Sequence, residues 1–579
     1  MCGIIGMASA EPFSVKKDLL SLLKRLEYRG YDSAGWATSS MKSDKKVGYI
    51  DRLIAATGNI KTRTAIAHTR WATHGGVTRK NAHPHSNKDK TLFAIHNGII
   101  ENFKEMKEKL TKRGYRFITE TDSEIIPHYF DHWLGKLPMK EVMQKFMKEA
   151  KGTFAILILR KDDERIYAMK RDSPLVMGIL QGRRIVASDI YAFSDSTDQA
   201  IFFEDDEGAI ISADRARFFT ADGKGKRKKA VTIPQTEAEE SKENYPHYMI
   251  KEVKEQPVAA KRLLTSLRTV QRPHFMKLID LIRKAGRVVF VACGTSYHAT
   301  LVGVYLLKKQ GIKAHTVIAS EFENFLWVDK KTLVIAVTQS GETMDVLTVL
   351  KDVKQKGCAI ASIVNVPYST VQRMSTVSLE VCAGQEICVA ATKSFTNQVI
   401  TMLAIGDAMG YRLDLRSVPD KIRKTISMNE SKVRRIAKQL KAEKDIFVLG
   451  RGLSYPIARE IALKLKEIPY IHAEGMMGGE LKHGTIALIE KGTPVISLIP
   501  DNNSEMRANT QEVKARGARV LIIANREDQD DADLVVPWSD DAEFSIYACI
   551  VGHLLAYYIA KENGLPIDKP RNLAKSVTV

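Results

Sequence analysis

Short apolar runs alternate with turn residues along the first 231 residues of the chain. The runs TAIAHTRW, TLFAIHNGII, TFAILILR, RIYAMKR and RRIVASD are bounded by Gly, Asn or Asp, which predicts strands. Helical periodicity interrupts them near 16–26 and from Ser123 towards Trp133. Strands and helices do not alternate regularly, so we expect an α+β domain built from layered sheets.

A different pattern follows residues 232–250, which are polar, contain two prolines and show no periodicity, as a linker does. Beyond them, an apolar run, a small-residue loop and a helix recur, first as GRVVFVACGTSYHATLVGVYLL and TLVIAVTQSGET. The same order is repeated in KDIFVLGRGLSYPIAREIALKLKEI and TPVISLIPDNN. The equivalent glycines, Gly294 and Gly452, lie 158 residues apart (452 − 294). The pattern predicts a duplicated, doubly wound α/β domain.

Composition narrows the class of protein. The 579 residues are 44% hydrophobic and carry a net charge of +20, which suits a large globular protein with anionic substrates or partners. The densest basic cluster, KGKRKK at 224–229, lies among glycines and is interpreted as an exposed turn; nucleic-acid binding is the alternative. Six isolated cysteines, no signal peptide and an apolar stretch at 546–559 too short for a bilayer indicate a cytoplasmic protein.

Cys2 is a candidate nucleophile. Once Met1 is removed, Cys2 carries a thiol beside a free α-amine, and an amine with a pKa near 8 can act as its base. A buried structural thiol would explain Cys2 alone. The continuation CGIIG, followed by YRGYDSAG, HTRWATHG, HNGIIEN and TDSE, is far more specific.

With these motifs the chain resembles the class II glutamine amidotransferases, which use an N-terminal cysteine nucleophile on an αββα fold. The resemblance implies that Cys2 attacks the glutamine amide, forms a thioester and releases ammonia, while Asn97 and the Gly98 N–H form the oxyanion hole. Arg70 and Asp122 would bind the carboxylate and ammonium of glutamine. Further glutamine-binding residues are implied at Trp71, Thr73, His74 and His83.

Several histidines near these motifs invite a metal site. His68, His74, His83, His85 and His96 lack H-E-x-x-H or Cys-paired spacing, so hydrogen bonding within strand ends and loops is favoured. We expect no metal and no cofactor.

Hydroxyl-rich loops follow two strands of the first repeat. CGTS and TQSGET each lie between a strand and a helix, where backbone N–H groups and hydroxyls bind a phosphate; helix caps without a ligand are the alternative. A dinucleotide site at Gly450-Arg451-Gly452 is disfavoured because Tyr455 replaces the third glycine.

Charged residues in the second repeat suggest acid–base chemistry. Glu460, Lys464 and Glu467 recur at i, i+4 and i+7, hence on one helix face, although a solvated stripe has the same spacing. The last lysine, Lys575, lies in the tail PRNLAKSVTV, which could simply be frayed.

The second half resembles the sugar isomerase (SIS) domains of the glutamine–fructose-6-phosphate aminotransferase (isomerizing) family, because it contains, in this order, CGTS, SGET, LKLKEI, GELKHG and PRNLAKSVTV. With the glutaminase motifs, the resemblance covers the whole chain. The resemblance implies that Lys575 forms an imine with the C2 ketone of the sugar, that Glu467 moves a proton between C1 and C2, and that Lys464 assists. It also implies that His483, from a neighbouring subunit, opens the sugar ring, and that Trp71 gates a passage for ammonia. Residues implied in sugar-phosphate binding are Thr295, Ser296, Thr338, Gln339, Ser340, Thr343 and Val389.

The resemblance also sets the expected organisation. We expect a glutaminase domain over 1–231, a linker over 232–250, SIS domains over 251–425 and 426–569, and a catalytic tail over 570–579. The expected activity converts fructose-6-phosphate and glutamine to glucosamine-6-phosphate and glutamate, the first step of hexosamine synthesis. A homodimer is expected, with no nucleic-acid or membrane partner.

Departures from the family pattern are Thr338 in place of Ser, Ala391 in place of Ser, and an end at Val579 without a final Glu. None removes a catalytic group. A phosphoribosyl amidotransferase would need a pyrophosphate loop and an acidic run, and a phosphosugar sensor a helix-turn-helix; the sequence has none of these.

Overall fold

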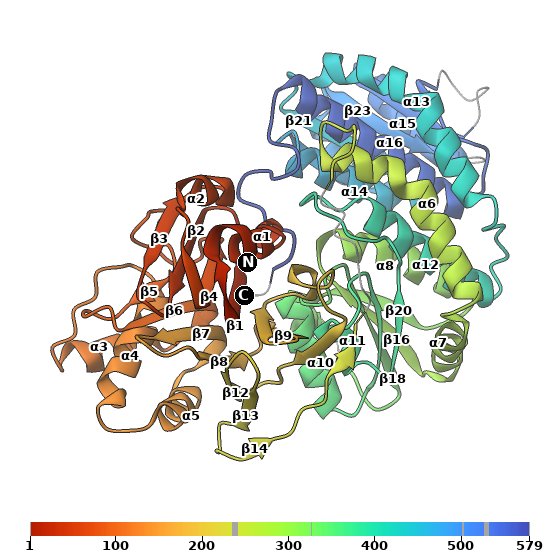
Figure 1. Ribbon diagram of the computed structural model, residues 1–579. Helices are drawn as coiled ribbons and strands as arrows, with labels where there is room; N and C mark the ends of the chain where they lie inside the picture. Colours follow the sequence, from red (N-terminus) through yellow and green to blue (C-terminus); the bar gives the residue numbers. More distant parts are fainter. Residues whose placement is uncertain (1, 234–240, 326, 501–502, 526–531, 578–579) are drawn as a thin grey trace. The chain divides into compact units, whose positions relative to one another are not determined.

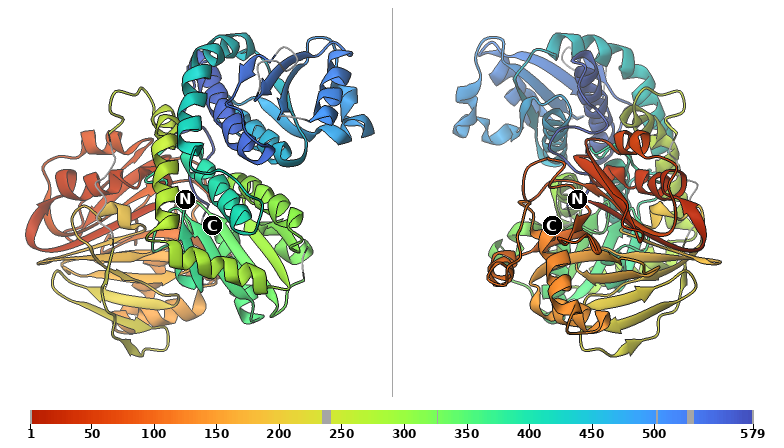
Figure 2. Two further views of the ribbon diagram at one scale, coloured as in Figure 1. Left: turned by 90° about the vertical axis from the view of Figure 1, so that its right-hand side faces the viewer. Right: turned by 60° about the vertical axis from the view of Figure 1, so that its left-hand side comes forward.

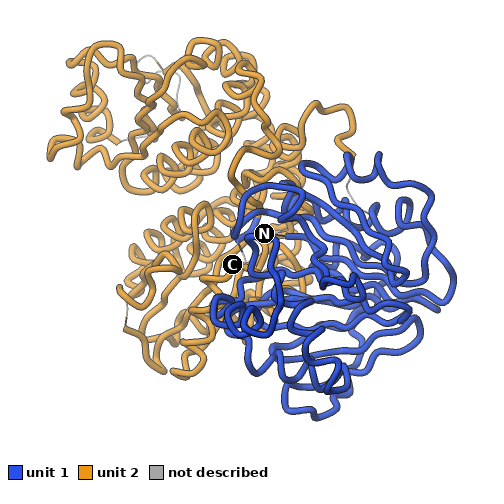
Figure 3. Tube along the Cα trace, turned by 90° about the vertical axis from the view of Figure 1, so that its left-hand side faces the viewer, with its two compact units in different colours: residues 1–240, 576–579 blue, residues 241–575 orange. Residues whose placement is uncertain are grey.

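The computed structural model describes residues 2–233, 241–325, 327–500, 503–525 and 532–577. Two compact units make up the chain (Figure 3). The first contains Met1–Glu240 with the last four residues, and the second contains Ser241–Lys575. The boundary therefore falls inside the segment predicted as a linker.

The first unit contains two antiparallel sheets. The eight-stranded sheet has the order β15-β11-β9-β10-β1-β4-β2-β3 and the seven-stranded sheet the order β14-β13-β12-β8-β7-β6-β5 (Figure 1). Strands of the first are β1 Gly3–Ser14, β2 Ser33–Thr38, β3 Ser43–Val47, β4 Lys61–Arg70, β9 Val176–Leu180, β10 Arg183–Ala187, β11 Gln199–Phe202 and β15 Val231–Thr232. Strands of the second are β5 His85–Ser86, β6 Leu92–Ile100, β7 Gly152–Arg160, β8 Ile166–Arg171, β12 Glu207–Ile211, β13 Ala216–Thr220 and β14 Gly225–Lys226.

Side-chain alternation along the seven-stranded sheet explains how its layers form. In β7, Phe154, Ile156 and Ile158 point into a core shared with α3 Phe103–Thr111, α4 Ile125–Leu134 and α5 Met139–Glu149. The intervening Ala155, Leu157 and Leu159 pack instead with side chains of the eight-stranded sheet. Because neighbouring residues of a strand face opposite sides, one strand serves both cores.

The eight-stranded sheet is covered on its other side by α1 Leu20–Lys24 with the helical turn before it, and by α2 Ile50–Ala56. The layers run helix, sheet, sheet, helix. This arrangement confirms the predicted αββα fold.

The second unit contains two parallel five-stranded sheets with the same strand order. They are β17-β16-β18-β19-β20 and β22-β21-β23-β24-β25. Strands of the first are β16 Arg287–Ala292, β17 Ala314–Ile318, β18 Thr332–Thr338, β19 Ala359–Val364 and β20 Val377–Glu380. Strands of the second are β21 Asp445–Gly450, β22 His472–Met477, β23 Pro494–Ile499, β24 Arg519–Ala524 and β25 Leu534–Val535. The shared order confirms the duplication.

Helices bury both faces of each of these sheets. In β16, Val288 and Phe290 face the large core of the unit, while Val289 and Val291 face α9 Phe322–Phe325, α10 Met344–Gln355 and α11 Thr370–Met374. The second sheet is built likewise, with α15 Ser504–Lys514 on its outer face. Burial on both faces explains why these strands are nearly continuous apolar runs.

One core joins the two sheets of the second unit. Its helices are α6 Tyr248–Arg268, α7 Arg272–Lys284, α8 Gly294–Lys309, α12 Lys393–Ala408, α13 Val418–Leu440, α14 Tyr455–Glu467 and α16 Asp541–Glu562. Figure 2 shows α13 running along α16, which it contacts. The expected boundary at 425/426 therefore falls inside a helix, because the apolar face of α13 packs on α16 and α6.

Two segments differ from the sequence-based expectation of a linker over 232–250. Val231–Thr232 still pairs with β11, and α6 already begins at Tyr248. Burial of Met249 and Ile250 in the common core explains the early start of the helix.

Helix α16 is long and apolar enough to cross a membrane by length and composition alone. Its apolar window is entirely buried within the protein, as in a core helix. The basic turn at 224–229 is partly neutralised, because Lys226 and Lys228 both form ion pairs with Glu207 (2.8 and 2.9 Å).

Candidate active sites

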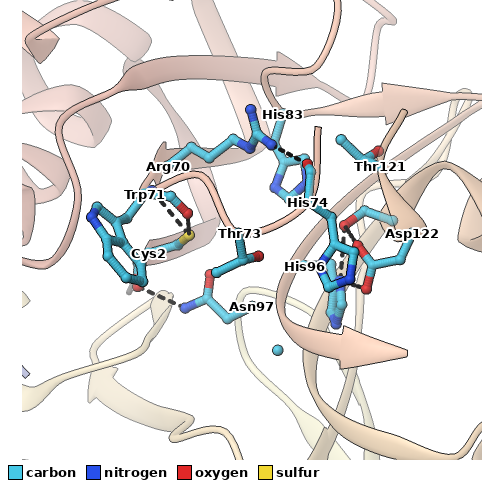
Figure 4. Close-up of a pocket in the computed structure, with 12 residues that line it drawn as sticks. Cys2, Arg70, Trp71, Thr73, His74, His83, His96, Asn97, Thr121 and Asp122 are labelled. Atoms are coloured by element: carbon cyan, nitrogen blue, oxygen red, sulfur yellow. Dashed lines mark hydrogen bonds and ion pairs between the residues drawn. The ribbon is translucent and has the colours of Figure 1, made fainter. Parts of the chain in front are cut away.

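A pocket in the first unit collects every residue that the sequence predicted for glutamine chemistry. Figure 4 shows their side chains around it. The lining residues from the prediction are Cys2, Arg70, Trp71, Thr73, His74, His83, Asn97, Gly98 and Asp122. His96, Thr121 and Ser123 also line the pocket and were not predicted as site residues.

Strand pairing brings the nucleophile to this pocket. Cys2 directly precedes β1, which lies beside β4, and β4 ends at Arg70. The Trp71 N–H donates to Cys2 Sγ at 3.2 Å. Burial raises the pKa of the Cys2 thiol, while that N–H and Arg70 act in the opposite direction. The thiol therefore needs a base, which the adjacent α-amine would supply.

The loop after β4 is folded around Arg70. Its guanidinium donates to the carbonyl oxygens of His74 (2.5 Å), Gly75 (3.1 Å) and Gly76 (3.2 Å). Arg70 thereby gives residues 71–76 their shape as well as a positive charge. Asp122 is held at the other side by the Ile100 N–H (2.8 Å) and the Ser123 hydroxyl (3.1 Å).

Asn97 is oriented with its amide nitrogen towards Cys2. Asn97 Nδ2 donates to the Cys2 carbonyl oxygen at 2.7 Å, and Asn97 Oδ1 lies 3.0 Å from His68 Nε2. His68 Nε2 also lies 3.1 Å from the His96 carbonyl oxygen and 2.9 Å from His83 Nδ1; because the two oxygens can only accept, we assign the proton to this nitrogen. Burial lowers the pKa of His68 to about 3, which keeps the ring neutral.

This orientation of Asn97 leads to a prediction for His68→Ala. Without the ring, the Asn97 amide oxygen loses the N–H that donates to it, and the amide can rotate away from the oxyanion position. We expect kcat for glutamine hydrolysis to fall by about 10- to 100-fold, less than the roughly 100- to 1,000-fold typical for deleting a donor outright. The KM for glutamine should change little. His132→Ala, on α4 and bonded to Arg113, is the control; an unchanged kcat in His68→Ala would contradict the role.

Gly98 sits where a side chain does not fit. Its φ is +119°, and a Cβ would lie 2.1 Å from the Thr153 carbonyl oxygen on β7. We expect Gly98→Ala to destabilise the first unit by at least about 1–3 kcal/mol and to abolish glutamine hydrolysis, since the oxyanion loop must shift. Gly58→Ala, where a Cβ meets nothing within 4 Å, is the matched control. Thermal unfolding and glutaminase assays of both variants would decide it.

Two further histidines of this region, His85 and His96, hydrogen-bond within the protein, as expected. His96 Nδ1 lies 2.9 Å from Ser123 Oγ, and His85 Nε2 lies 3.2 Å from Thr121 Oγ1. Burial also lowers the pKa values of His83, His85 and His96.

The predicted phosphate loops of the second unit lie at one sheet edge. β16 and β18 are parallel neighbours, so the loops at their carboxyl ends are adjacent. Thr295 and Ser296 lie in the first turn of α8, and Thr343 occupies the position just before α10. Thr338 Oγ1 lies 2.9 Å from Thr343 Oγ1, and Ser340 Oγ accepts from the Glu342 N–H at 3.2 Å. Gln339 lies between Thr338 and Ser340, in the same loop.

The charged stripe on α14 faces the protein interior and this edge. Glu460 and Lys464 are fully buried; Glu460 Oε1 accepts from Thr295 Oγ1 (3.0 Å), and Lys464 Nζ donates to the same hydroxyl (3.2 Å). Lys464 Nζ also lies 2.5 Å from Glu467 Oε2. Burial opposes the charge on Lys464, but Glu460 and Glu467 outweigh it and raise its pKa.

The C-terminal lysine is anchored. Lys575 Nζ donates to Glu386 Oε2 at 2.5 Å and to the Cys388 carbonyl oxygen at 2.8 Å, and its side chain is 3% exposed. Burial opposes ionisation of Glu386, yet Lys575 and the Ser394 hydroxyl lower its pKa to about 2. Val389 belongs to the same loop and donates its N–H to the carbonyl oxygen of Asp568, two residues before the tail.

Helix α12 connects Lys575 to the phosphate edge. Ser394 Oγ donates to Glu386, and Gln398 Nε2 donates to Ser296 Oγ at 3.0 Å. Ser394 and Gln398 are four residues apart, so they lie on one helix face with Cβ atoms about 5–6 Å apart. One face of α12 therefore bonds both to the carboxylate that holds Lys575 and to the phosphate loop.

Sequence reasoning missed Glu386, Gln398 and His298, whose Nδ1 lies 2.7 Å from Glu460 Oε2. A charged residue inside the apolar run AGQEICVAA was a usable signal for Glu386. His483 is exposed at the end of the helical turn Gly478–His483, and within the described chain no hydrogen bond joins it to the other sugar-site residues.

Fold and sites together define a glutamine amidotransferase domain joined to sugar isomerase domains. The Glutamine amidotransferase domain family matches residues 68–195, and the SIS domain family matches 281–406 and 439–536. Glutamine–fructose-6-phosphate aminotransferases [isomerizing] from Thermococcus kodakarensis and Methanosarcina acetivorans are each 40% identical, over all of this chain and all of theirs. A solved C-terminal domain of glucosamine-fructose-6-phosphate aminotransferase from Francisella tularensis is 31% identical, with a TM-score of 0.51, over 57% of this chain and 100% of that one.

The chain belongs to the glutamine–fructose-6-phosphate aminotransferase [isomerizing] family. It is an enzyme, and the family expected from the sequence is confirmed.

Proposed function

We propose that this chain converts fructose-6-phosphate and glutamine to glucosamine-6-phosphate and glutamate. The observation that carries the proposal is that one chain holds a set of residues for glutamine hydrolysis and a second set for sugar chemistry. One places Cys2 beside Asn97, and the other places Lys575 on Glu386 next to the phosphate edge. As the first committed amination of the sugar, this reaction would begin hexosamine synthesis.

At the glutamine site, Cys2 Sγ forms the bond to the amide carbon and the α-amine takes the thiol proton. Asn97 Nδ2, already aimed at Cys2, would donate to the developing oxyanion together with the Gly98 N–H. Collapse of the tetrahedral adduct releases ammonia, which carries away the proton, and water then hydrolyses the thioester to glutamate. Arg70 and Asp122 would hold the two charged ends of the amino acid.

At the sugar site, Thr295, Ser296 and the 338–343 loop would bind the phosphate. Lys575 would form an imine with C2, losing water, and ammonia would displace the lysine to leave an imine on the sugar. Glu467 would then move a proton from C1 to C2, with Lys464 holding its carboxylate (2.5 Å). His483 would act in ring opening from a second copy of the chain in a homodimer. We place this enzyme in the cytoplasm.

Labelling tests the proposal. The enzyme is incubated with glutamine carrying ¹⁵N in the amide and with fructose-6-phosphate, and the sugar product is analysed by mass spectrometry. One ¹⁵N atom per hexosamine-6-phosphate is expected. Glutamate formation without ¹⁵N in any sugar would overturn the proposal.

A further inference from the structure

A buried carboxylate outside the roles assigned above contacts the loop that holds Lys575. Glu252 lies in the second turn of α6 and is 2% exposed. Its Oε1 accepts from the Ile387 N–H at 2.6 Å and from the Cys388 N–H at 3.1 Å. A carboxyl oxygen that accepts two consecutive backbone N–H groups fixes both the position and the orientation of that peptide segment.

The same segment presents its other side to Lys575. Cys388 gives its N–H to Glu252 and its carbonyl oxygen to Lys575 Nζ, at 2.8 Å. Glu386, one residue before the segment, provides the second acceptor for Lys575. A shift of 386–388 would therefore displace both acceptors of the ammonium group at once.

The segment that leads into the tail is tied to the same two elements. Asp568 accepts from the Met249 N–H through Oδ1 (3.0 Å) and from the Val389 N–H through its backbone oxygen (3.0 Å). Met249 and Glu252 are three residues apart on α6, so one helix end anchors both the loop and the residue from which the chain enters the tail.

We infer that Glu252 is a positioning residue for Lys575: by clamping residues 386–388 to α6, it sets where the lysine amine meets the sugar carbonyl. The inference rests on the proposed function. The alternative is a purely structural staple between helix and loop.

The protonation state of Glu252 gives a measurement that separates the two roles, because a purely structural contact would not change the pH dependence of imine formation. Burial raises the pKa of Glu252 to about 8, with Glu386 acting in the same direction and Lys575 and Lys393 against it. The charged and titratable groups that face Glu252 are Glu386 and the Cys388 thiol from the loop, Lys575 from the tail and Lys393 from α12. Among the described residues, Glu252 Oε2 has no hydrogen-bond partner. While Glu252 is neutral, Glu386 alone balances Lys575; once Glu252 is ionised, a second negative charge lies near the lysine amine and slows imine formation.

The test traps the imine with borohydride in the full-length enzyme, with fructose-6-phosphate, between pH 6.5 and 9.5. Glu252→Ala should trap sugar on the Lys575 peptide at least about tenfold more slowly, the scale of effect that small misplacements produce. The KM for the sugar should change less than kcat, and basal glutamine hydrolysis should not change. Glu252→Gln keeps an oxygen for both N–H groups, so its trapping at pH 7 should be close to that of the unmodified enzyme. Above pH 8, trapping in Glu252→Gln should be faster than in the unmodified enzyme, because the glutamine cannot acquire the second negative charge.

Glu255→Gln, on the same helix and bonded to Lys393, is the matched control and should follow the unmodified enzyme. Normal trapping in Glu252→Ala would overturn the inference. If that variant fails to fold, Glu252→Gln decides: a pH profile identical to the unmodified enzyme would also overturn it. Absence of trapping in the unmodified enzyme would instead refute the proposed function.

Discussion

Replacing Cys2 by alanine should abolish glutamine hydrolysis while fructose-6-phosphate still binds the second unit. Removing the nucleophile of an acyl-transfer enzyme costs on the order of 10⁶-fold in kcat, and what remains comes from the oxyanion hole and binding. Among the described residues that line this pocket, Cys2 is the only cysteine, so no other thiol can replace it. Glutamate release from glutamine is the measurement.

Two further variants test the nucleophile and its base separately, and the first is Cys2→Ser. It keeps a hydroxyl at the position of the sulfur, but an alcohol is a far weaker nucleophile at neutral pH, so only residual hydrolysis is expected. A variant that retains Met1 should lose activity as well, because the α-amine of Cys2 is then part of a peptide bond. Cys358→Ala, in the second unit, is the control. Full hydrolysis in Cys2→Ala would refute the nucleophile.

Replacing Lys575 by arginine should eliminate glucosamine-6-phosphate synthesis, by about 10³-fold or more, while basal glutamine hydrolysis remains. Arginine keeps the positive charge opposite Glu386 but cannot form an imine with a ketone. The anchoring by Glu386 (2.5 Å) and the Cys388 carbonyl oxygen identifies this amine as one held in place rather than frayed. Product formation and borohydride trapping by mass spectrometry measure the loss.

Two outcomes would contradict the role of Lys575. Trapping of the sugar on Lys464 would move the imine to α14, and normal synthesis in Lys575→Arg would remove the need for an imine at the tail. Lys569→Arg, six residues upstream, controls for general effects on the tail.

Much of the fold was predictable because burial leaves a period in the sequence. Apolar runs such as TFAILILR indicated strands, and β7 is one of them; the structure adds that its side chains enter two cores. The repeated strand–loop–helix units indicated two sheets of one type, and both have the same strand order. The boundaries were less predictable, since α13 and the start of α6 depend on contacts with helices far along the chain.

The sequence by itself determined the family, the αββα and doubly wound architectures, and which residue types carry the glutamine chemistry. Short motifs retain this information because backbone geometry and reacting groups constrain residues close together in the chain. Only the tertiary structure decided which groups hold them: His68 behind Asn97, Glu386 beneath Lys575, and Glu252 behind the 386–388 loop. The last two pairs lie 189 and 135 residues apart, and long-range hydrogen-bond partners of buried charges follow from packing, which leaves no period in the sequence.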